Sequence, residues 1–203
     1  MFLRRASAPV PKGMVGSGLA FVVQKHKATS LHYDFRLEVG GVMPSWSVPK
    51  GPSLDSGVKR LAMPTGDHAL GYRNFEGVIP RGGYGAGPVM VWDRGTYDPE
   101  IEVAKGVRSR ITSREEAETV ASRGLREGNL KFFLRGKKLK GSFALVRMSG
   151  ADGKALWLMI KHRDKYSVAG YDANDFDYSA VTRRTLAQIM ASGGRAPEGQ
   201  LTL

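Results

Sequence analysis

The sequence predicts a mainly β fold: a small closed or partly open β-barrel of short antiparallel strands with two peripheral helices. Short extended runs recur from residue 19 onward, and Pro-, Gly- and Asn-containing breaks separate them at intervals typical of antiparallel sheets. Helical signals occur in only two segments. Many short strands with two helices outside them favour a barrel or a curled sheet over other architectures.

The first half of the chain is predicted to be almost entirely extended. Residues 113–127 then carry the first helical signal, because Ser113 and Glu116 have the spacing of a capping box and Gly124 or Gly128 ends the segment. The extended runs before this helix are residues 19–24, 30–39, 44–49, 75–80 and 87–93.

The second half is predicted to add three strands and a short helix. Gly136 to Lys138 supplies the first turn, Asp152-Gly153 supplies the second, and Gly193-Gly194 stops the helix. We therefore divide the chain into a flexible arm (1–18), a barrel domain (19–166) and a C-terminal helix with a loose tail (167–203). The three strands are residues 129–136, 139–148 and 154–162, and the helix is residues 182–191.

Composition excludes several classes of protein. The 203 residues include no cysteine, which removes disulfides, thiolate zinc sites and cysteine nucleophiles. No stretch approaches the roughly 18 apolar residues of a spanning helix, and the N-terminal residues lack the apolar core of a secretory signal. We expect a monomeric cytoplasmic protein with no membrane contact.

Positive charge is concentrated in one segment. Lys and Arg number 31 against 19 Asp and Glu, a net charge of +12. Residues 105–165 hold 16 basic and 6 acidic side chains, so this segment carries +10 of that charge. Such a concentration favours a polyanion, above all nucleic acid, as the partner, although a soluble protein with a basic face is the alternative.

Three of the four histidines indicate a reactive site. On a strand, His32, Asp34 and Arg36 share one face, while the apolar residues between them share the core face. Side chains at i and i+2 start about 6–7 Å apart, whereas metal donors lie only about 2.0–2.2 Å from their ion. We therefore expect one ligand from this strand, with His26 and His68 completing a site suited to Mn, Zn or Fe. The alternative is an exposed strand with unconnected polar side chains.

Other motifs have ordinary structural explanations. Residues 82–87 are glycine-rich but match neither the G-x-G-x-x-G nor the Walker pattern, so we predict a hairpin or tight bend. The three tryptophans lie in apolar runs and are expected in the core. His162 is isolated from the other histidines and is expected to be structural. Lys137, Lys138 and Lys140 form at least a solvated turn, and we predict that they contact a phosphate backbone.

Long motifs in a fixed order resemble the 3′-phosphoesterase domain of bacterial and archaeal ATP-dependent DNA ligase D. The resemblance runs from about Phe21 to Tyr166, with a weaker echo in the final helix. The motifs are Phe21–Ala28, Leu31–Glu38, Ser45–Pro52, Lys59–Ala62, Asp67–Tyr72, Phe75–Pro80, Tyr84–Gly95, Leu139–Gly141, Leu145–Met148 and Trp157–Asp164.

The resemblance implies a manganese-dependent enzyme, with Zn²⁺ or Co²⁺ as alternatives, that heals DNA 3′ ends during end joining. Its substrates would be primer–templates or nicked duplexes that end in a 3′-phosphate or a 3′-ribonucleotide. Ku and the repair ligase and polymerase would be partners, and the enzyme would associate with the nucleoid. The resemblance assigns the metal to His26, Asp34 and His68, the scissile phosphate to His32, Arg36 and Tyr72, an ordering role to Gln24, and supporting positive charge to Lys50 and Arg60.

The chain departs from the family pattern at two places. Ala8-Pro9 stands where an acid is expected, and Gly66 precedes Asp67 where the family carries glutamate. Both positions bear on ribonucleoside removal more than on phosphate removal. No K-x-[DN]-G motif occurs, so we expect no ligase activity in these residues. The alternatives are a non-catalytic nucleic-acid-binding module and a metal enzyme acting on small phosphoesters.

Overall fold

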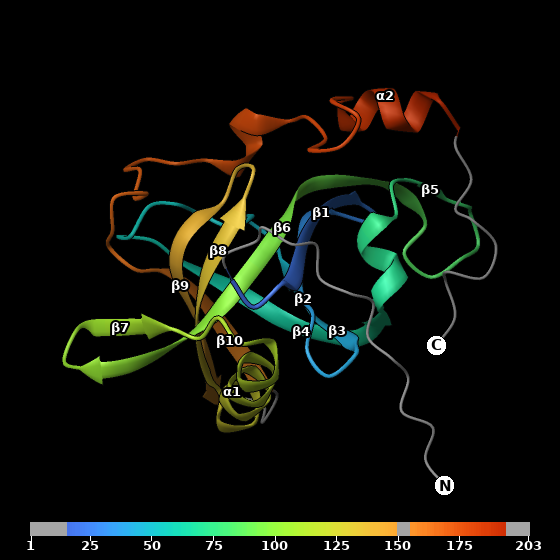
Figure 1. The fold of residues 1–203 in the computed structure, drawn as a ribbon. Helices are drawn as coiled ribbons and strands as arrows, with labels where there is room; N and C mark the ends of the chain where they lie inside the picture. The colour runs from blue at the N-terminus through green and yellow to red at the C-terminus, as the bar shows by residue number, and fades with distance from the viewer. Residues whose placement is uncertain (1–15, 150–154, 194–203) are drawn as a thin grey trace, which may run out of the picture.

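The computed structural model describes residues 16–149 and 155–193 and shows an antiparallel β-barrel (Figure 1). Eight strands follow the order β1-β2-β3-β4-β10-β9-β8-β6, and the pairing of β6 with β1 closes the barrel. β5 and β7 pair with β6 outside this circle. The strands are β1 (Leu19–Lys27), β2 (Leu31–Leu37), β3 (Val42–Val48), β4 (Lys59–Ala69), β5 (Gly77–Ile79), β6 (Gly87–Ala104), β7 (Val107–Arg110), β8 (Asn129–Gly136), β9 (Lys140–Ser149) and β10 (Ala155–Lys161).

The interior of the barrel is filled by large side chains from alternate strand positions. Phe35 and Phe132 stack with ring centroids 5.8 Å apart, and Trp92 and Tyr97 are fully buried beside them. The predicted core position of all three tryptophans is confirmed. Because successive strand residues point to opposite faces, this filling turns the neighbouring polar residues of β1 and β2 out of the barrel.

The longest strand, β6, joins the two halves of the barrel. It pairs with β1 on one side and with β8 on the other. Gly95 is required at this crossing, because a Cβ atom there would lie 2.0 Å from the carbonyl oxygen of Arg135. The predicted strand over residues 87–93 covers only the first seven of the 18 residues of β6. Its continuation, β4 and β7 have weak alternation and were not expected.

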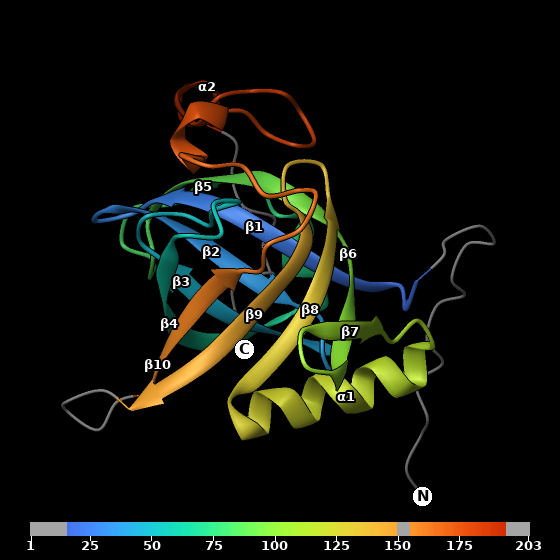
Figure 2. The same ribbon diagram turned by 90° about the vertical axis from the view of Figure 1, so that its left-hand side faces the viewer.

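The two α-helices lie at opposite ends of the barrel (Figures 1 and 2). α1 (Arg114–Glu127) begins after Ser113 and ends at Gly128, which has a φ of +79°. The capping box predicted at Ser113 does not form, because its side chain makes no cap hydrogen bond. α2 (Leu186–Ala191) instead has a complete capping box between Thr185 and Gln188.

The segment that leads to α2 is fastened to the barrel by lysines. The Lys137 ammonium donates to the carbonyl of Ala180, and that of Lys138 donates to the carbonyls of Trp92 and Tyr178. Lys138 also lies over both aromatic rings, 5.0 Å from the Trp92 centroid and 4.1 Å from the Tyr178 centroid. Burial lowers the pKa of Lys138 to about 8. Two of the lysines predicted to meet DNA thus make hydrogen bonds within the protein, although Lys137 is exposed.

Further sequence-based predictions concern the N-terminal arm, a β-turn and the absence of a membrane span. Most of the predicted arm, residues 1–18, lies outside the described residues, as does the turn at Asp152-Gly153. Within the described part of the chain, no helix is long and apolar enough to cross a membrane.

Candidate functional site

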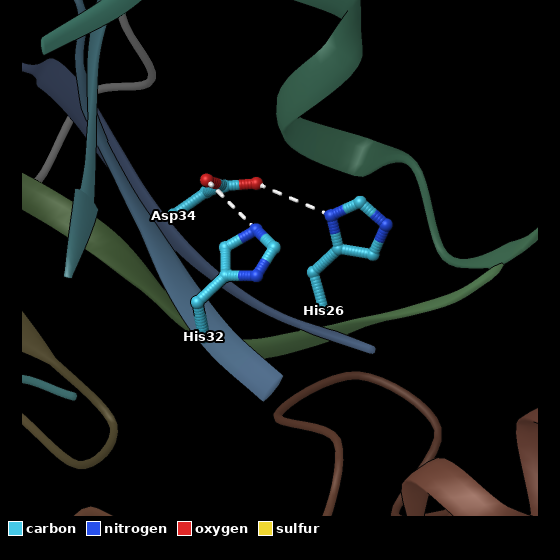
Figure 3. A group of neighbouring side chains, drawn as sticks. All are labelled: His26, His32 and Asp34. Atoms are coloured by element: carbon cyan, nitrogen blue, oxygen red, sulfur yellow. Dashed lines mark ion pairs between the residues drawn. The ribbon is translucent and has the colours of Figure 1, made fainter. Parts of the chain in front are cut away.

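A tight hairpin between β1 and β2 builds the centre of the site. Its three-residue turn, residues 28–30, sets His26 directly opposite His32 and Gln24 opposite Asp34. Opposed residues of an antiparallel pair have neighbouring side chains on one face, and the two imidazole centroids are 4.8 Å apart. Figure 3 shows both rings turned toward the Asp34 carboxylate.

The spacing of these three side chains fits a single metal ion. Nδ1 of His26 is 3.7 Å from Oδ2 of Asp34, and Nε2 of His32 is 3.6 Å from Oδ1. One ligand atom from each residue lies within 4.8 Å of the others. Donors about 2.0–2.2 Å from a shared ion lie up to roughly 4.4 Å apart. The group therefore needs only small side-chain movements to enclose an ion.

Backbone carbonyls orient both imidazoles. Nε2 of His26 is 2.8 Å from the carbonyl oxygen of Gly85, and Nδ1 of His32 is 3.0 Å from that of Ser30. A carbonyl oxygen only accepts hydrogen bonds, so each of these ring nitrogens carries a proton. The other nitrogen of each ring faces Asp34, as in metal sites where a carbonyl behind each histidine orients the ring. Two imidazoles and a carboxylate suit Mn²⁺ or Zn²⁺.

Arg36 lies beside this group on the same face of β2 and is almost completely buried. Its Nη2 donates to Asp34 at 2.9 Å, and its Nε donates to the amide oxygen of Gln24 at 2.8 Å. The Gln24 amide nitrogen in turn donates to the carbonyls of Tyr72 and Phe75. Gln24 therefore fixes the guanidinium with one end and the 3₁₀ turn η1 (Leu70–Asn74) with the other.

His68 of β4 contacts Arg36 from the opposite side. Its Nδ1 is 2.9 Å from Nη1 of Arg36 and 2.9 Å from the carbonyl oxygen of Gly66, and its Nε2 is 3.3 Å from the same Nη1. Because a guanidinium only donates, the imidazole accepts from Arg36. The ring of Tyr72 lies 4.9 Å from the imidazole and 5.0 Å from the guanidinium carbon. Burial and the charge of Arg36 lower the pKa of His68, which favours the neutral ring.

The ionisation of Asp34 and Arg36 follows from the same contacts. Burial raises the pKa of the Asp34 carboxyl, but the neighbouring His26 and the positive charge of Arg36 outweigh it and lower the pKa below its usual value. Burial also lowers the pKa of Arg36, and Asp34 opposes that change. The site thus holds a carboxylate and a guanidinium in direct contact.

These residues line a cavity of about 930 Å³. His26, His32, Asp34 and Arg36 come from the β1–β2 hairpin, and His68 and Tyr72 come from β4 and η1. The remaining lining comes from the ends of β3 and β4 and from the loop between β5 and β6. A cavity of this size can hold a small organic ligand, with polar side chains on one part of its wall.

Residues 24–147, which contain every group described above, match the DNA ligase D 3′-phosphoesterase domain family. The chain belongs to this family. It is 44% identical over 146 residues to the multifunctional non-homologous end joining protein LigD of Pseudomonas aeruginosa. The matched residues are 72% of this chain and 15% of that protein.

Two mycobacterial relatives of the 3′-phosphoesterase family match a longer part of the chain. The multifunctional non-homologous end joining DNA repair protein LigD of Mycobacterium tuberculosis is 35% identical over 184 residues, which are 91% of this chain and 21% of the relative. The corresponding protein of Mycolicibacterium smegmatis is 36% identical over 185 residues, 90% of this chain and 22% of the relative. The chain therefore spans less than a quarter of the relatives it matches.

The surroundings of two histidines of the family motif bear on the sequence-based assignment. That assignment gave His68 to the metal and His32 to the phosphate. Among the described residues, the group with metal-ligand spacing contains His32 with His26 and Asp34, and His68 contacts Arg36 instead. The sequence feature that could have placed His32 beside His26 was the short turn after Lys27, because a tight hairpin there pairs the two residues.

The remaining predicted residues of the 3′-phosphoesterase motif are spread around the site. Lys50 and Lys140 are exposed, whereas Arg60 is partly buried with its Nε unpaired. Sequence reasoning missed Glu76, whose carboxylate accepts from the backbone N–H of Val91 and from Thr182. Glu76 thereby joins η1, the barrel wall and the C-terminal segment behind the cavity. Its place depends on contacts too distant in sequence for a local pattern to predict.

Proposed function

We propose that this chain is a metal-dependent DNA 3′-phosphoesterase that converts a 3′-phosphate to a 3′-hydroxyl during double-strand break repair by end joining. Removal of a 3′-terminal ribonucleoside is the second reaction that we assign to the same site. The observation that carries the proposal is the pair of imidazoles held by backbone carbonyls with their free nitrogens facing Asp34. Family membership and the named role of the relatives in end joining support the choice of substrate.

His26, His32 and Asp34 are the residues we assign to the metal, with Mn²⁺ preferred and Zn²⁺ or Co²⁺ as alternatives. This assignment exchanges His32 for His68 relative to the one made from the sequence. A divalent ion there supplies Lewis-acid polarisation of a phosphoryl oxygen and a bound water of lowered pKa. The protein contributes the ligand geometry, because the hairpin and the Gly85 and Ser30 carbonyls hold the imidazoles in place.

Arg36, His68 and Tyr72 are assigned to the phosphate. The Arg36 guanidinium is fixed by Asp34 and Gln24, so it meets developing negative charge without reorganisation. A neutral His68 accepts a hydrogen bond from Arg36 and lines the cavity beside the position proposed for the phosphate. Gln24 positions both Arg36 and the turn that carries Tyr72. Its role is therefore orientation and not contact with substrate.

The basic surface is assigned to the DNA duplex beyond the 3′ end. Exposed lysines such as Lys50 and Lys140 neutralise backbone phosphates, and the log of the binding constant should fall with the log of salt by about 0.9 per phosphate contacted. We further propose a monomer that acts at the nucleoid in the cytoplasm. Its partners there would be Ku and the ligase and polymerase that act on the healed end.

The decisive experiment incubates the chain and Mn²⁺ with two primer–templates, one ending in a 3′-phosphate and one in a single 3′-ribonucleotide. We expect a 3′-hydroxyl from the first, and from the second through a 3′-phosphate intermediate. Asp34→Ala should abolish both reactions, while Asp175→Ala, which removes an exposed acid that does not line the cavity, should leave them intact. DNA binding without turnover in any divalent ion would instead indicate a binding module. Hydrolysis of aryl phosphoesters without DNA preference would indicate a small-molecule phosphoesterase.

A further inference from the structure

One aromatic ring stands free at the mouth of the cavity. Tyr84 lines the cavity, and its relative exposure is 102%. It is the one aromatic residue among the large exposed hydrophobic residues of the described chain. Every other tyrosine of the described residues is buried or partly buried. A fully solvated ring is ordinary when it is isolated on a surface, but this one belongs to the wall of the candidate site.

The loop that carries Tyr84 is a defined bend and is joined to the metal group. Gly83 donates to the carbonyl of Pro80, and Ala86 donates to the carbonyl of Gly83. The next residue, Gly85, has a φ of +72° and accepts from Nε2 of His26 at 2.8 Å. Because consecutive Cα atoms are 3.8 Å apart, the ring starts one residue from a carbonyl that orients the proposed metal ligand.

We propose that Tyr84 is a stacking platform for the base of the 3′-terminal nucleotide and thereby determines which 3′ ends the site accepts. The proposal rests on the function given above, which puts the terminal phosphate between Arg36 and the metal group. The nucleoside attached to that phosphate must then leave through the mouth of the cavity, where the ring of Tyr84 is exposed. Base–aromatic stacking is a common and sequence-tolerant mode of single-strand recognition.

Charges around the ring fit the same arrangement. Lys27, at the end of β1, and Arg81, in the Tyr84 loop, are both exposed. The loop passes close to Lys27, since a Cβ atom on Gly87 would lie 2.1 Å from the Lys27 carbonyl oxygen. Neither cation forms an ion pair with another residue of the described ranges. An exposed aromatic ring in a loop that also carries Arg81, next to the strand end that carries Lys27, matches a base whose neighbouring phosphates meet positive charge.

A double-mutant cycle directly tests the contact between Tyr84 and the base of the terminal nucleotide. Its two changes are Tyr84→Ala in the protein and replacement of the terminal nucleoside by an abasic sugar in a 3′-phosphorylated primer–template. We expect KM with Mn²⁺ and the dissociation constant in EDTA, from fluorescence anisotropy, to rise about 5- to 50-fold in wild type when the base is removed. Tyr84→Ala should bind base-containing and abasic ends equally. Tyr84→Phe should keep the discrimination, as should Val103→Ala, which alters a remote exposed side chain.

The salt dependence of binding, KM and the dissociation constant together distinguish base stacking from phosphate contacts and from a failure of the proposed function. Stacking involves no counterion release, so Tyr84→Ala should leave the log–log salt slope unchanged. The proposal would be overturned if the abasic end lost equal affinity in wild type and in Tyr84→Ala, or if it lost none in either. If no end is hydrolysed by any variant, the proposed function fails. The anisotropy cycle then still decides whether Tyr84 recognises a base.

Discussion

His26 and His32 face each other across the β1–β2 hairpin, and each directs one ring nitrogen to a backbone carbonyl and the other toward Asp34. This relationship defines the candidate metal group, and Arg36 contacts that group through Asp34. His68 contacts Arg36 and is not part of the group.

The first prediction concerns the exchange of His32 and His68. His32→Ala removes a proposed ligand, so Mn²⁺ affinity should fall at least tenfold and turnover of a 3′-phosphate should be lost. His68→Ala should leave Mn²⁺ affinity within about twofold and reduce kcat instead. Titration calorimetry with Mn²⁺ checks both variants. If His68→Ala loses the metal and His32→Ala keeps it, the assignment made from the sequence alone is the right one.

We expect the function of Arg36 to require a guanidinium group and not only a positive charge. Its three contacts use Nε, Nη1 and Nη2 separately, and a lysine offers one point charge in place of this fork. Arg36→Lys should therefore lower kcat by about 100-fold, the usual effect of losing an oriented transition-state donor, while Mn²⁺ still binds. Steady-state kinetics with calorimetry measure this. Full activity of Arg36→Lys would show that charge alone suffices.

Two glycines with similar backbone conformations provide a matched pair. Gly85 (φ +72°) has the Cε1 atom of His26 only 3.3 Å from the position of an added Cβ, whereas Gly40 (φ +60°) has nothing within 4 Å. Both alanine variants incur left-handed strain and should lower the thermal midpoint by similar amounts. Only Gly85→Ala should also weaken Mn²⁺ binding, because its methyl group displaces the imidazole. Equal Mn²⁺ affinities in the two variants would contradict the role of the Gly85 loop.

The fourth prediction is a pH dependence of stability that originates far from the cavity. Burial lowers the pKa of His162 to about 4, and its Nδ1 is 2.8 Å from the hydroxyl oxygen of Ser142, whose proton is donated to Glu100. The unfolded chain binds this proton with a pKa of about 6.5. Between pH 6.5 and 4 the unfolded state therefore holds more protons, and stability falls as the pH is lowered. The charged groups that surround His162 are Arg108, Lys131, Lys161 and Asp164, with Glu100 beyond Ser142.

His162→Asn isolates this contribution. Asparagine retains a polar group near Ser142 but does not titrate, so urea midpoints of the variant should decline less than those of wild type from pH 6.5 to pH 4. Above pH 7 the two curves should run parallel. Identical declines over the acidic window would show that His162 is not kept neutral by the fold.

Lysines of one basic turn should divide into structural and DNA-binding groups. Lys138 is held by carbonyls and by two aromatic rings, so Lys138→Ala should lower the thermal midpoint by several degrees. Lys140 is exposed, so Lys140→Ala should leave stability unchanged and reduce the salt slope of duplex binding by about 0.9 if it contacts one phosphate. Thermal scans and salt-dependent anisotropy distinguish the two variants. An unchanged midpoint for Lys138→Ala would contradict its structural role.

The barrel was predictable because local patterns determine it. Alternation in residues 31–37 assigns Tyr33 and Phe35 to the core and His32, Asp34 and Arg36 to the other face, and the structure confirms this. β4 was missed because its exposed face mixes apolar and polar residues, which weakens the period-two signal. The missing capping bond at Ser113 shows that a matching spacing does not ensure the side-chain geometry.

Which residues form the site could be predicted from the sequence better than how those residues contact one another. The backbone spacing of about 6–7 Å between i and i+2 argued against His32 and Asp34 sharing an ion, yet the imidazole leans until its Nε2 is 3.6 Å from the carboxylate. The contact between His68 and Arg36 depends on the register of β3 with β4, which shifts between Met43 and Ser45. A long-range register with an irregularity is not specified by local sequence.

The most direct test of the metal assignment is an anomalous difference map from crystals of the chain soaked in Mn²⁺. We predict one peak about 2.0–2.2 Å from Nδ1 of His26, Nε2 of His32 and a carboxylate oxygen of Asp34, with His68 turned toward Arg36. A peak bound by His68 without His32, or no peak at a Mn²⁺ concentration that supports turnover, would contradict the account.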